Sequence, residues 1–282
     1  MLAILKAFRL GKVLSILLGV LTISIYAFGA VSYLQDRAIQ LRVGIGLISI
    51  FLLTCAGYLM NDYYDIKSDS INRPQRIPLK ELISEKNIKR LFIGFFLVGL
   101  IAALWVNLKF FSLIILDLAI LIFYNVYSKR LYLFKAVIVS LLVVSIYPLS
   151  LALTSGGYPS LRRDSLFVFP IWLFLIILAY EIAEDIVGMQ GDKEEGGNTL
   201  PIMIGAKKAR NLATLIALIS TPIAFIPYFK GMCGTVYLIG ALLTLPIFIG
   251  CMFFKEKTLS IGLLFYVRAI TFFSLVDIIL IK

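Results

Sequence analysis

The chain alternates between long apolar blocks and short polar segments, and this alternation predicts its elements. Each apolar block has about the 17 to 25 residues that a helix needs to cross a bilayer. We predict about nine membrane-spanning helices, at residues 13–34, 43–60, 91–108, 110–127, 131–154, 166–186, 211–229, 233–254 and 260–281. The expected fold class is therefore an all-α integral membrane protein. No linker or low-complexity stretch divides the sequence, so we expect one domain over residues 1–282.

Composition agrees with a membrane protein and excludes several functions. Of the 282 residues, 61% are hydrophobic and 15% are charged, which is typical of a chain whose solvent is lipid. The net charge is +11, but the basic residues lie in short loops and form no continuous basic domain, so we expect no nucleic-acid partner. There is no histidine, which excludes histidine bases and the usual zinc sites.

The distribution of basic residues predicts how the chain is oriented. The N-terminal segment and the loops after the second, fourth, sixth and eighth helices carry most of the lysines and arginines. Because such loops stay on the cytoplasmic side, we expect the N-terminus to be cytoplasmic in a multi-pass protein of the cell membrane. An odd number of helices would then leave the C-terminus outside.

The first acidic motif follows directly on the second apolar block. It reads Asn61-Asp62-Tyr63-Tyr64-Asp65-Ile66-Lys67-Ser68-Asp69. On a helix that turns about 100° per residue, its three carboxylates and the Asn61 amide fall within an arc of roughly 100°. A lone acidic cluster of this kind is compatible with a solvated helix end, but such a face repels itself unless a cation sits on it.

A second acidic cluster follows the sixth apolar block and favours a functional reading. It contains Glu181, Glu184, Asp185 and Asp192. The same helical count puts Glu181, Asp185 and Asp192 within about 40° of one another. Both clusters come at the cytoplasmic ends of membrane helices, so we predict one shared ion site.

The residue types at these clusters favour magnesium and a diphosphate. Carboxylates without histidine suit Mg²⁺, which keeps open positions for substrate phosphates. The predicted metal ligands are Asn61, Asp62, Asp65, Asp69, Asp185 and Asp192. The basic residues predicted to bind the diphosphate or phosphate are Arg73, Arg76, Lys80, Lys129, Arg130 and Lys193, with Tyr124 as a hydrogen-bond donor. An aromatic-rich crevice facing lipid would suit an isoprenoid tail.

Four further ionisable residues fall inside or near the ends of the predicted helices: Asp117, Lys135, Arg268 and Asp277. A charge there is costly and usually faces the interior of the bundle. Lys135 lies near a cytoplasmic end and can reach the interface with its long side chain. For Arg268 two roles stay open, binding of an acceptor phosphate or a structural pair with an acidic side chain.

These motifs resemble those of the UbiA-type intramembrane prenyltransferases. The resemblance rests on Asn-Asp-x-x-Asp-x-x-x-Asp at 61–69, on the acidic motif at 181–192 leading into Gly-Asn-Thr-Leu-Pro-Ile at 197–202, and on Tyr124 and Lys129 as a Tyr-x-x-x-x-Lys element. It covers nearly the whole chain. It implies a nine-helix bundle whose intramembrane cavity opens to the cytoplasm and binds a prenyl diphosphate through Mg²⁺.

Within that family, two stretches are most similar to the archaeal enzymes that make digeranylgeranylglyceryl phosphate. They are residues 69–78 and Glu-Asp-Ile ahead of Gly191-Asp192-Lys193. The similarity implies transfer of a geranylgeranyl group from geranylgeranyl diphosphate to the secondary hydroxyl of geranylgeranylglyceryl phosphate. The chain departs from relatives at Gly188, where a further Asp is frequent, and at Leu79-Lys80, where a small pair often follows the proline.

The residues expected to take part in catalysis are Asp62, Asp65, Asp185, Glu181, Tyr124 and Lys129. Glu181, Asp185 or the diphosphate itself can accept the proton of the acceptor hydroxyl, and the sequence leaves this choice open. Two rival functions also stay open. One is prenylation of an aromatic acceptor in quinone, haem or chlorophyll synthesis. The other is an ion-coupled transporter, although transporters place their charges near the bilayer midplane.

Overall fold

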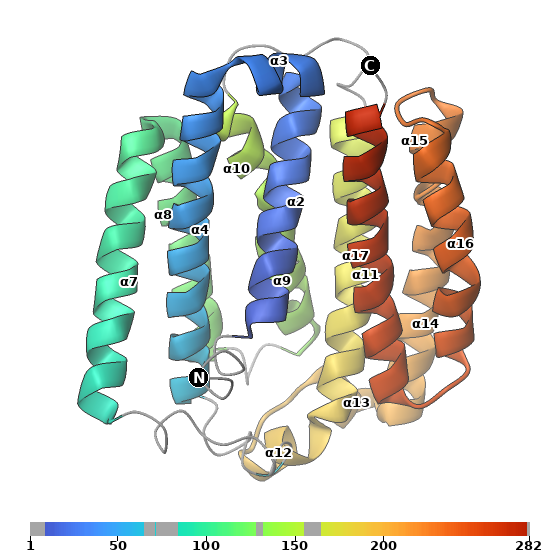
Figure 1. Ribbon diagram of the computed structural model, residues 1–282. Helices are drawn as coiled ribbons and strands as arrows, with labels where there is room; N and C mark the ends of the chain where they lie inside the picture. Colours follow the sequence, from blue (N-terminus) through green and yellow to red (C-terminus); the bar gives the residue numbers. More distant parts are fainter. Residues whose placement is uncertain (1–8, 65–70, 72–83, 128–131, 155–164, 281–282) are drawn as a thin grey trace.

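The computed structural model describes residues 9–64, 71, 84–127, 132–154 and 165–280, and these residues form helices and the turns between them (Figure 1). The helices are α2 (Leu10–Phe28), α3 (Ala30–Gln35), α4 (Arg37–Tyr64), α7 (Glu85–Val106), α8 (Leu108–Tyr127), α9 (Leu133–Val144), α10 (Ile146–Leu153), α11 (Ser165–Val187), α12 (Met189–Glu194), α13 (Leu200–Ile204), α14 (Ala206–Ile223), α15 (Ile226–Phe229), α16 (Thr235–Met252) and α17 (Glu256–Leu280).

Within the described residues, nine stretches are long and apolar enough to cross a membrane, which confirms the predicted all-α membrane fold. They are Leu10–Phe28, Arg37–Asp62, Lys86–Val106, Leu108–Tyr127, Leu133–Leu153, Phe167–Val187, Ala206–Phe229, Thr235–Met252 and Glu256–Leu280. Most boundaries differ from the predicted ones by a few residues, because hydropathy reports the apolar part of a helix and misses its polar ends.

The first span is shorter than predicted. It ends at Phe28, because Gly29 has φ +91°, a left-handed conformation that glycine adopts at low cost. The short helix α3 follows across one end of the bundle (Figure 1). The predicted continuation of this span to Leu34 is therefore wrong.

The fifth span is broken into α9 and α10 at Ser145. Pro148, in the first turn of α10, has no N–H to donate to the carbonyl of Val144, so a continuous helix would leave that acceptor without its partner. The Ser145 hydroxyl has one proton to donate and lies within hydrogen-bond distance of the Leu142 carbonyl (2.8 Å) and of the Asp117 carboxylate of α8 (2.6 Å). The break is thus fixed by a neighbouring helix.

The second acidic motif does not lie on one helix. The main helix α11 ends at Val187, and Asp192 belongs to the separate short helix α12. The predicted alignment of Glu181, Asp185 and Asp192 along one helical face is therefore wrong, because the chain turns at Gly188.

The helix α11 lies at the centre of the packing, in contact with α9, α14 and α17. The helix α4 packs mainly against α7, and α2 packs against α10, α4 and α17. Figure 1 shows α3 and α15 at one end of the bundle and α12 and α13 at the other. The ends of α4, α8 and α11 and the starts of α2 and α9 all point toward the α12 end, so their terminal polar residues can share one site.

Candidate active site

A cavity of about 450 Å³ runs inside the bundle, between α2, α4, α8, α9, α10, α11 and α17. Toward the α12 end its walls are charged and polar: Arg9, Lys12, Asn61, Tyr124, Asn125, Lys135, Glu181, Glu184, Asp185 and Asp192. Farther in, the lining is mostly apolar and aromatic and includes Tyr26, Tyr147, Phe169 and Trp172. A cavity that is charged at one end and apolar along its length suits a ligand with an ionic head and a hydrocarbon tail.

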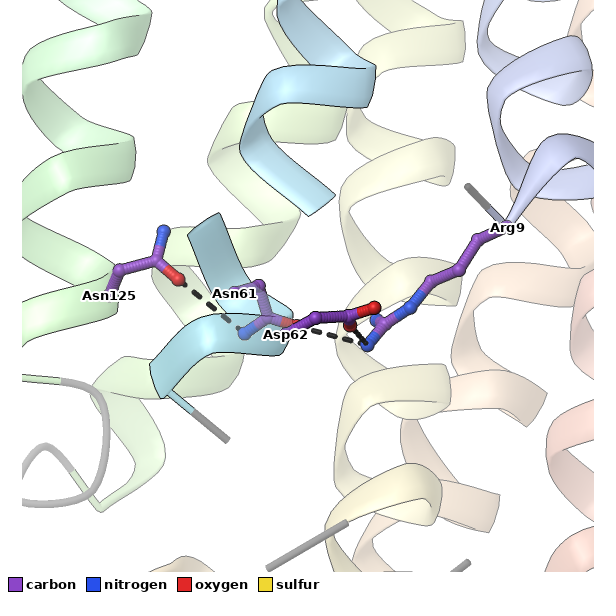
Figure 2. Close-up of polar contacts among 4 residues, drawn as sticks. All are labelled: Arg9, Asn61, Asp62 and Asn125. Carbon is purple, nitrogen blue, oxygen red and sulfur yellow. Dashed lines mark hydrogen bonds and ion pairs between the residues drawn. The ribbon is translucent and has the colours of Figure 1, made fainter. Parts of the chain in front are cut away.

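The first acidic motif points its oxygen atoms at one cation. The Nη2 of Arg9 donates to Oδ1 of Asn61 at 3.1 Å and to Oδ1 of Asp62 at 2.9 Å. Figure 2 shows the Arg9 side chain reaching from the start of α2 to the last turns of α4. On the other side, Nδ2 of Asn61 donates to Oδ1 of Asn125 on α8 at 3.5 Å. These contacts hold the Asn61 amide with its oxygen toward Arg9.

The second acidic motif also converges on a cation. The Nζ of Lys135, at the start of α9, donates to Oδ1 of Asp185 at 2.6 Å and lies 3.6 Å from Oδ2 of Asp192. The Asp185 side chain is only 4% exposed, so its charge depends on a nearby positive group. Lys135 thereby brings α11 and α12 together at one point.

Asp192 owes its position to a glycine. The Gly197 N–H donates to the Asp192 carbonyl at 2.7 Å. A Cβ at position 197 would lie 2.8 Å from that oxygen, closer than real Cβ contacts come. The glycine of the Gly-Asn-Thr stretch therefore allows the close turn that returns the chain to α12.

Aromatic rings line the space between the two motifs. The Arg9 guanidinium lies 5.1 Å from the centroid of the Tyr58 ring, and Nζ of Lys12 lies 5.1 Å from that of the Tyr180 ring. Both distances are within the range of a cation–π contact. Lys12 also interacts electrostatically with Glu181. Both rings thus lie at the charged end of the cavity, close to its cations.

Six of the predicted site residues are brought together. Asn61, Tyr124, Glu181, Asp185 and Asp192 line the cavity, and Asp62 pairs with Arg9 at its edge. Lys193 is exposed on α12 and does not line it. The other predicted residues, Asp65, Asp69, Arg73, Arg76, Lys80, Lys129 and Arg130, lie outside the described residues.

Three cations of the site are not among the residues predicted from the sequence: Arg9, Lys12 and Lys135. From the sequence, Arg9 and Lys12 indicate only the orientation of the chain, and Lys135 can reach the interface with its long side chain. Instead Lys135 is 17% exposed and pairs with two carboxylates. The rule that an ionisable residue inside a span faces the interior of the bundle applies to Lys135, but the rule does not say which carboxylates it pairs with.

The arrangement fits a magnesium site made of oxygen ligands. Asn61 and Asp62 aim one oxygen each at a single point, and Asp185 and Asp192 do the same at a second point. Amide and carboxylate oxygens are the ligands that Mg²⁺ takes in proteins. Among the residues that the structure describes, no group of three acidic side chains forms a complete metal site. Asp65 and Asp69 of the first motif lie outside the described residues.

Comparison with known proteins agrees with the fold and the motifs. The chain matches the UbiA prenyltransferase family over residues 12–273. It is 33% identical over 205 residues to the digeranylgeranylglyceryl phosphate synthase of Methanosarcina mazei, covering 72% of this chain and 69% of the relative. It is 34% identical over 198 residues to that of Sulfolobus acidocaldarius, covering 70% and 69%.

Solved structures share the fold. A digeranylgeranylglyceryl phosphate synthase structure matches with a TM-score of 0.70 at 22% identity and covers 98% of both chains. A UbiA homologue from Archaeoglobus fulgidus, bound to DMAPP and Mg²⁺, matches with a TM-score of 0.67 at 14% identity and covers 99% of both chains. With the family match over almost the whole length, the chain belongs to the UbiA prenyltransferase family.

Proposed function

We propose that this chain transfers a geranylgeranyl group from geranylgeranyl diphosphate to the secondary hydroxyl of geranylgeranylglyceryl phosphate, with Mg²⁺ as cofactor. The product, digeranylgeranylglyceryl phosphate, carries the second ether bond of archaeal membrane lipids. One observation carries the proposal: two pairs of acidic-motif oxygens converge at the charged end of a long apolar cavity. The archaeal synthases at about one-third identity support the choice of acceptor.

The residues that would hold Mg²⁺ are Asn61, Asp62, Asp185 and Asp192, together with Asp65 and Asp69 from the first motif. When bound, the metal supplies positive charge to the diphosphate as its bond to the prenyl chain breaks. Arg9, Lys12 and Lys135 surround the same end of the cavity, and their N–H groups are suited to donate to phosphate oxygens.

The reaction exchanges one C–O bond for another. The bond between C1 of the prenyl chain and the diphosphate breaks, and its electron pair leaves with the diphosphate. The rings of Tyr58 and Tyr180 lie beside this end of the cavity and can stabilise the positive charge that develops on the allylic carbon. The acceptor oxygen then bonds to C1.

The acceptor hydroxyl must lose its proton in the same step. Glu181 and Asp185 line the cavity, and either carboxylate, or the departing diphosphate, can accept it. The Nζ of Lys135 donates to Oδ1 of Asp185 at 2.6 Å, so one oxygen of that buried carboxylate is already engaged. Glu181 makes no such bond to Lys135, so it is our preferred base.

The charged end of the cavity is proposed to face the cytoplasm, where the soluble diphosphate product can leave. The basic loops at that end support this orientation under the positive-inside rule. On the same argument, the protein lies in the cell membrane with its N-terminus cytoplasmic and its C-terminus outside.

The proposal is tested with purified protein, Mg²⁺ and labelled geranylgeranyl diphosphate. Geranylgeranylglyceryl phosphate and 4-hydroxybenzoate are offered in parallel, with an EDTA control. We expect a metal-dependent product from the glycerol phosphate lipid alone. Product from the aromatic acid alone would be compatible with the family but would show that the acceptor is an aromatic compound. No product from either acceptor would contradict the proposed activity.

Two substitutions test the metal site within the same assay. Asp62→Ala and Asp185→Ala each remove one of the converging oxygens, so both should abolish most of the Mg²⁺-dependent transfer. Glu194→Ala is the matched control, because it also removes a carboxylate but its side chain is exposed and does not line the cavity. If either acidic variant keeps full activity and the same Mg²⁺ requirement, the two-motif site is wrong.

A further inference from the structure

Arg268 is a cation in an unusual place. It lies midway along the span Glu256–Leu280, about 18 Å from either end at the rise of an α-helix. Its side chain is exposed, on a helix long and apolar enough to cross a bilayer. A charge at this depth is costly and by default serves a function.

Two hydrogen bonds fix Arg268 against the first turns of α2. Its Nε donates to Oγ of Ser15 at 2.8 Å, and its Nη2 donates to the carbonyl of Gly11 at 3.0 Å. Figure 1 shows α2 beginning partway along α17, which explains how a residue in the middle of one span meets the start of another. The guanidinium is thereby held in one orientation.

Both contacts of Arg268 go to neutral oxygens, a hydroxyl and a carbonyl. Within the described part of the chain, no carboxylate pairs with it, and its Nη1 makes no hydrogen bond. Among the described residues, Arg268 therefore does not form the pair with an acidic side chain that the sequence allowed. A guanidinium with unused N–H groups is suited to a phosphate, which it can bind in a bidentate manner.

The cavity reaches the position of Arg268. Ser15, which accepts from Arg268, lines the cavity, as do Leu264, Val267 and Thr271 on the turns of α17 next to Arg268. Lys12 lies one turn before Ser15 on α2 and also lines the cavity. Arg268 therefore lies on the wall that α2 and α17 form, next to the cations at the charged end of the cavity but on a different helix from the two acidic motifs of α4, α11 and α12.

We propose that Arg268 binds the phosphate of the acceptor lipid at the seam between α2 and α17, and so makes the enzyme specific for a phosphorylated acceptor. This inference rests on the proposed function. The donor needs its cations at the acidic motifs, whereas the acceptor brings a second phosphate that needs a cation of its own. An exposed arginine that adjoins the cavity meets that need, while the acceptor's tail stays in the bilayer.

The test is a chemical double-mutant cycle between Arg268 and the phosphate. The value of kcat/KM is measured for geranylgeranylglyceryl phosphate and for geranylgeranylglycerol, which lacks the phosphate, with wild-type protein and Arg268→Gln. We expect the variant to lose roughly 10- to 100-fold with the phosphorylated acceptor, as for a charge-assisted hydrogen bond. The loss should come through KM of that acceptor, with the unphosphorylated acceptor and KM for the donor unchanged.

Ser15→Ala provides the matched control, because it removes a contact between α2 and α17 and keeps the guanidinium. It should retain the preference for the phosphorylated acceptor. If Ser15→Ala reproduces Arg268→Gln, or if Arg268→Gln slows both acceptors equally, Arg268 is a structural tie and the proposal is overturned.

Two further results separate the possible failures. If Arg268→Gln does not fold, Arg268→Lys tests the proposal instead. It keeps the positive charge but loses the planar guanidinium that can bind a phosphate in a bidentate manner. It should then show a smaller loss, confined to the phosphorylated acceptor, and an equal loss with both acceptors would contradict the proposal. If wild-type protein does not use geranylgeranylglyceryl phosphate at all, the proposed function fails and this inference fails with it.

Discussion

Lys135 shows how much one side chain contributes at the residue scale. It neutralises Asp185 directly and lies within ion-pair distance of Asp192, so its removal would leave two carboxylates close together at a nearly buried position. Breaking such a pair from one side costs far more than the pair itself contributes, because the remaining charge is left without compensation.

We therefore expect Lys135→Met to destabilise the protein by about 3 kcal/mol in the absence of metal. The measurement is thermal unfolding in detergent with EDTA. It is repeated with Mg²⁺, which should reduce the difference in stability between Lys135→Met and wild type. Glu256→Gln is the control, since it removes the pair with Arg210 in which both side chains are about one-third exposed, worth less than about 1 kcal/mol. A cost for Lys135→Met as small as that of the control would show that Lys135 only reaches toward the interface.

At the scale of elements, the crossing of α16 and α17 depends on a glycine. A Cβ at Gly240 would lie 2.0 Å from Cγ of Phe273, and 2.6 Å from its Cβ. The ring cannot turn away from a contact that includes its own Cβ, so the two helices would have to separate.

Gly240→Ala should accordingly lower stability by about 1–3 kcal/mol, the usual cost of overpacking. Gly250→Ala on the same helix is the matched control, because nothing lies within 4 Å of a Cβ there. It should be neutral or slightly stabilising, since alanine loses less backbone entropy in a helix than glycine. Equal melting temperatures for the two variants would mean that α16 and α17 pack less closely than described.

The elements also show what a sequence can predict. All nine spans follow from apolar block length, because a bilayer imposes a minimum length on every crossing helix. Their interruptions do not: the breaks at Gly29, Ser145 and Gly188 lie within apolar or helix-compatible stretches. They depend on backbone conformation and on contacts such as that between Ser145 and Asp117, which no local pattern contains.

The candidate site divides in the same way. The acidic residues could be predicted because several negatively charged residues at helical spacing form a clear sequence pattern. Their cationic partners could not, since Arg9 lies 53 positions from Asp62 and Lys135 lies 50 from Asp185. Pairing over such separations is decided by how the spans pack.

At the scale of the whole molecule, the basic loops predict the orientation in the membrane. Lys193 and Lys230 are both exposed and belong to opposite ends of the bundle, near α12 and α15. Lys193→Cys and Lys230→Cys, each in a background without Cys55, Cys233 and Cys251, can be labelled with a membrane-impermeant maleimide. In intact spheroplasts we expect Lys230→Cys to react and Lys193→Cys to react only after permeabilisation. The reverse pattern would place the charged end of the cavity outside.

The pairs of Arg9 with Asp62 and of Lys135 with Asp185 have a thermodynamic consequence for ligand binding. Each acidic motif already has a positive partner, so a divalent ion arriving alone must compete with it, and a diphosphate arriving alone meets carboxylates that repel it. Arriving together, the two ligands balance each other's charge and leave Arg9 and Lys135 free to donate to phosphate. Metal and donor should therefore bind with positive cooperativity, each raising the affinity of the other by the same factor, which titration of Mg²⁺ with and without a non-reactive diphosphate analogue would measure.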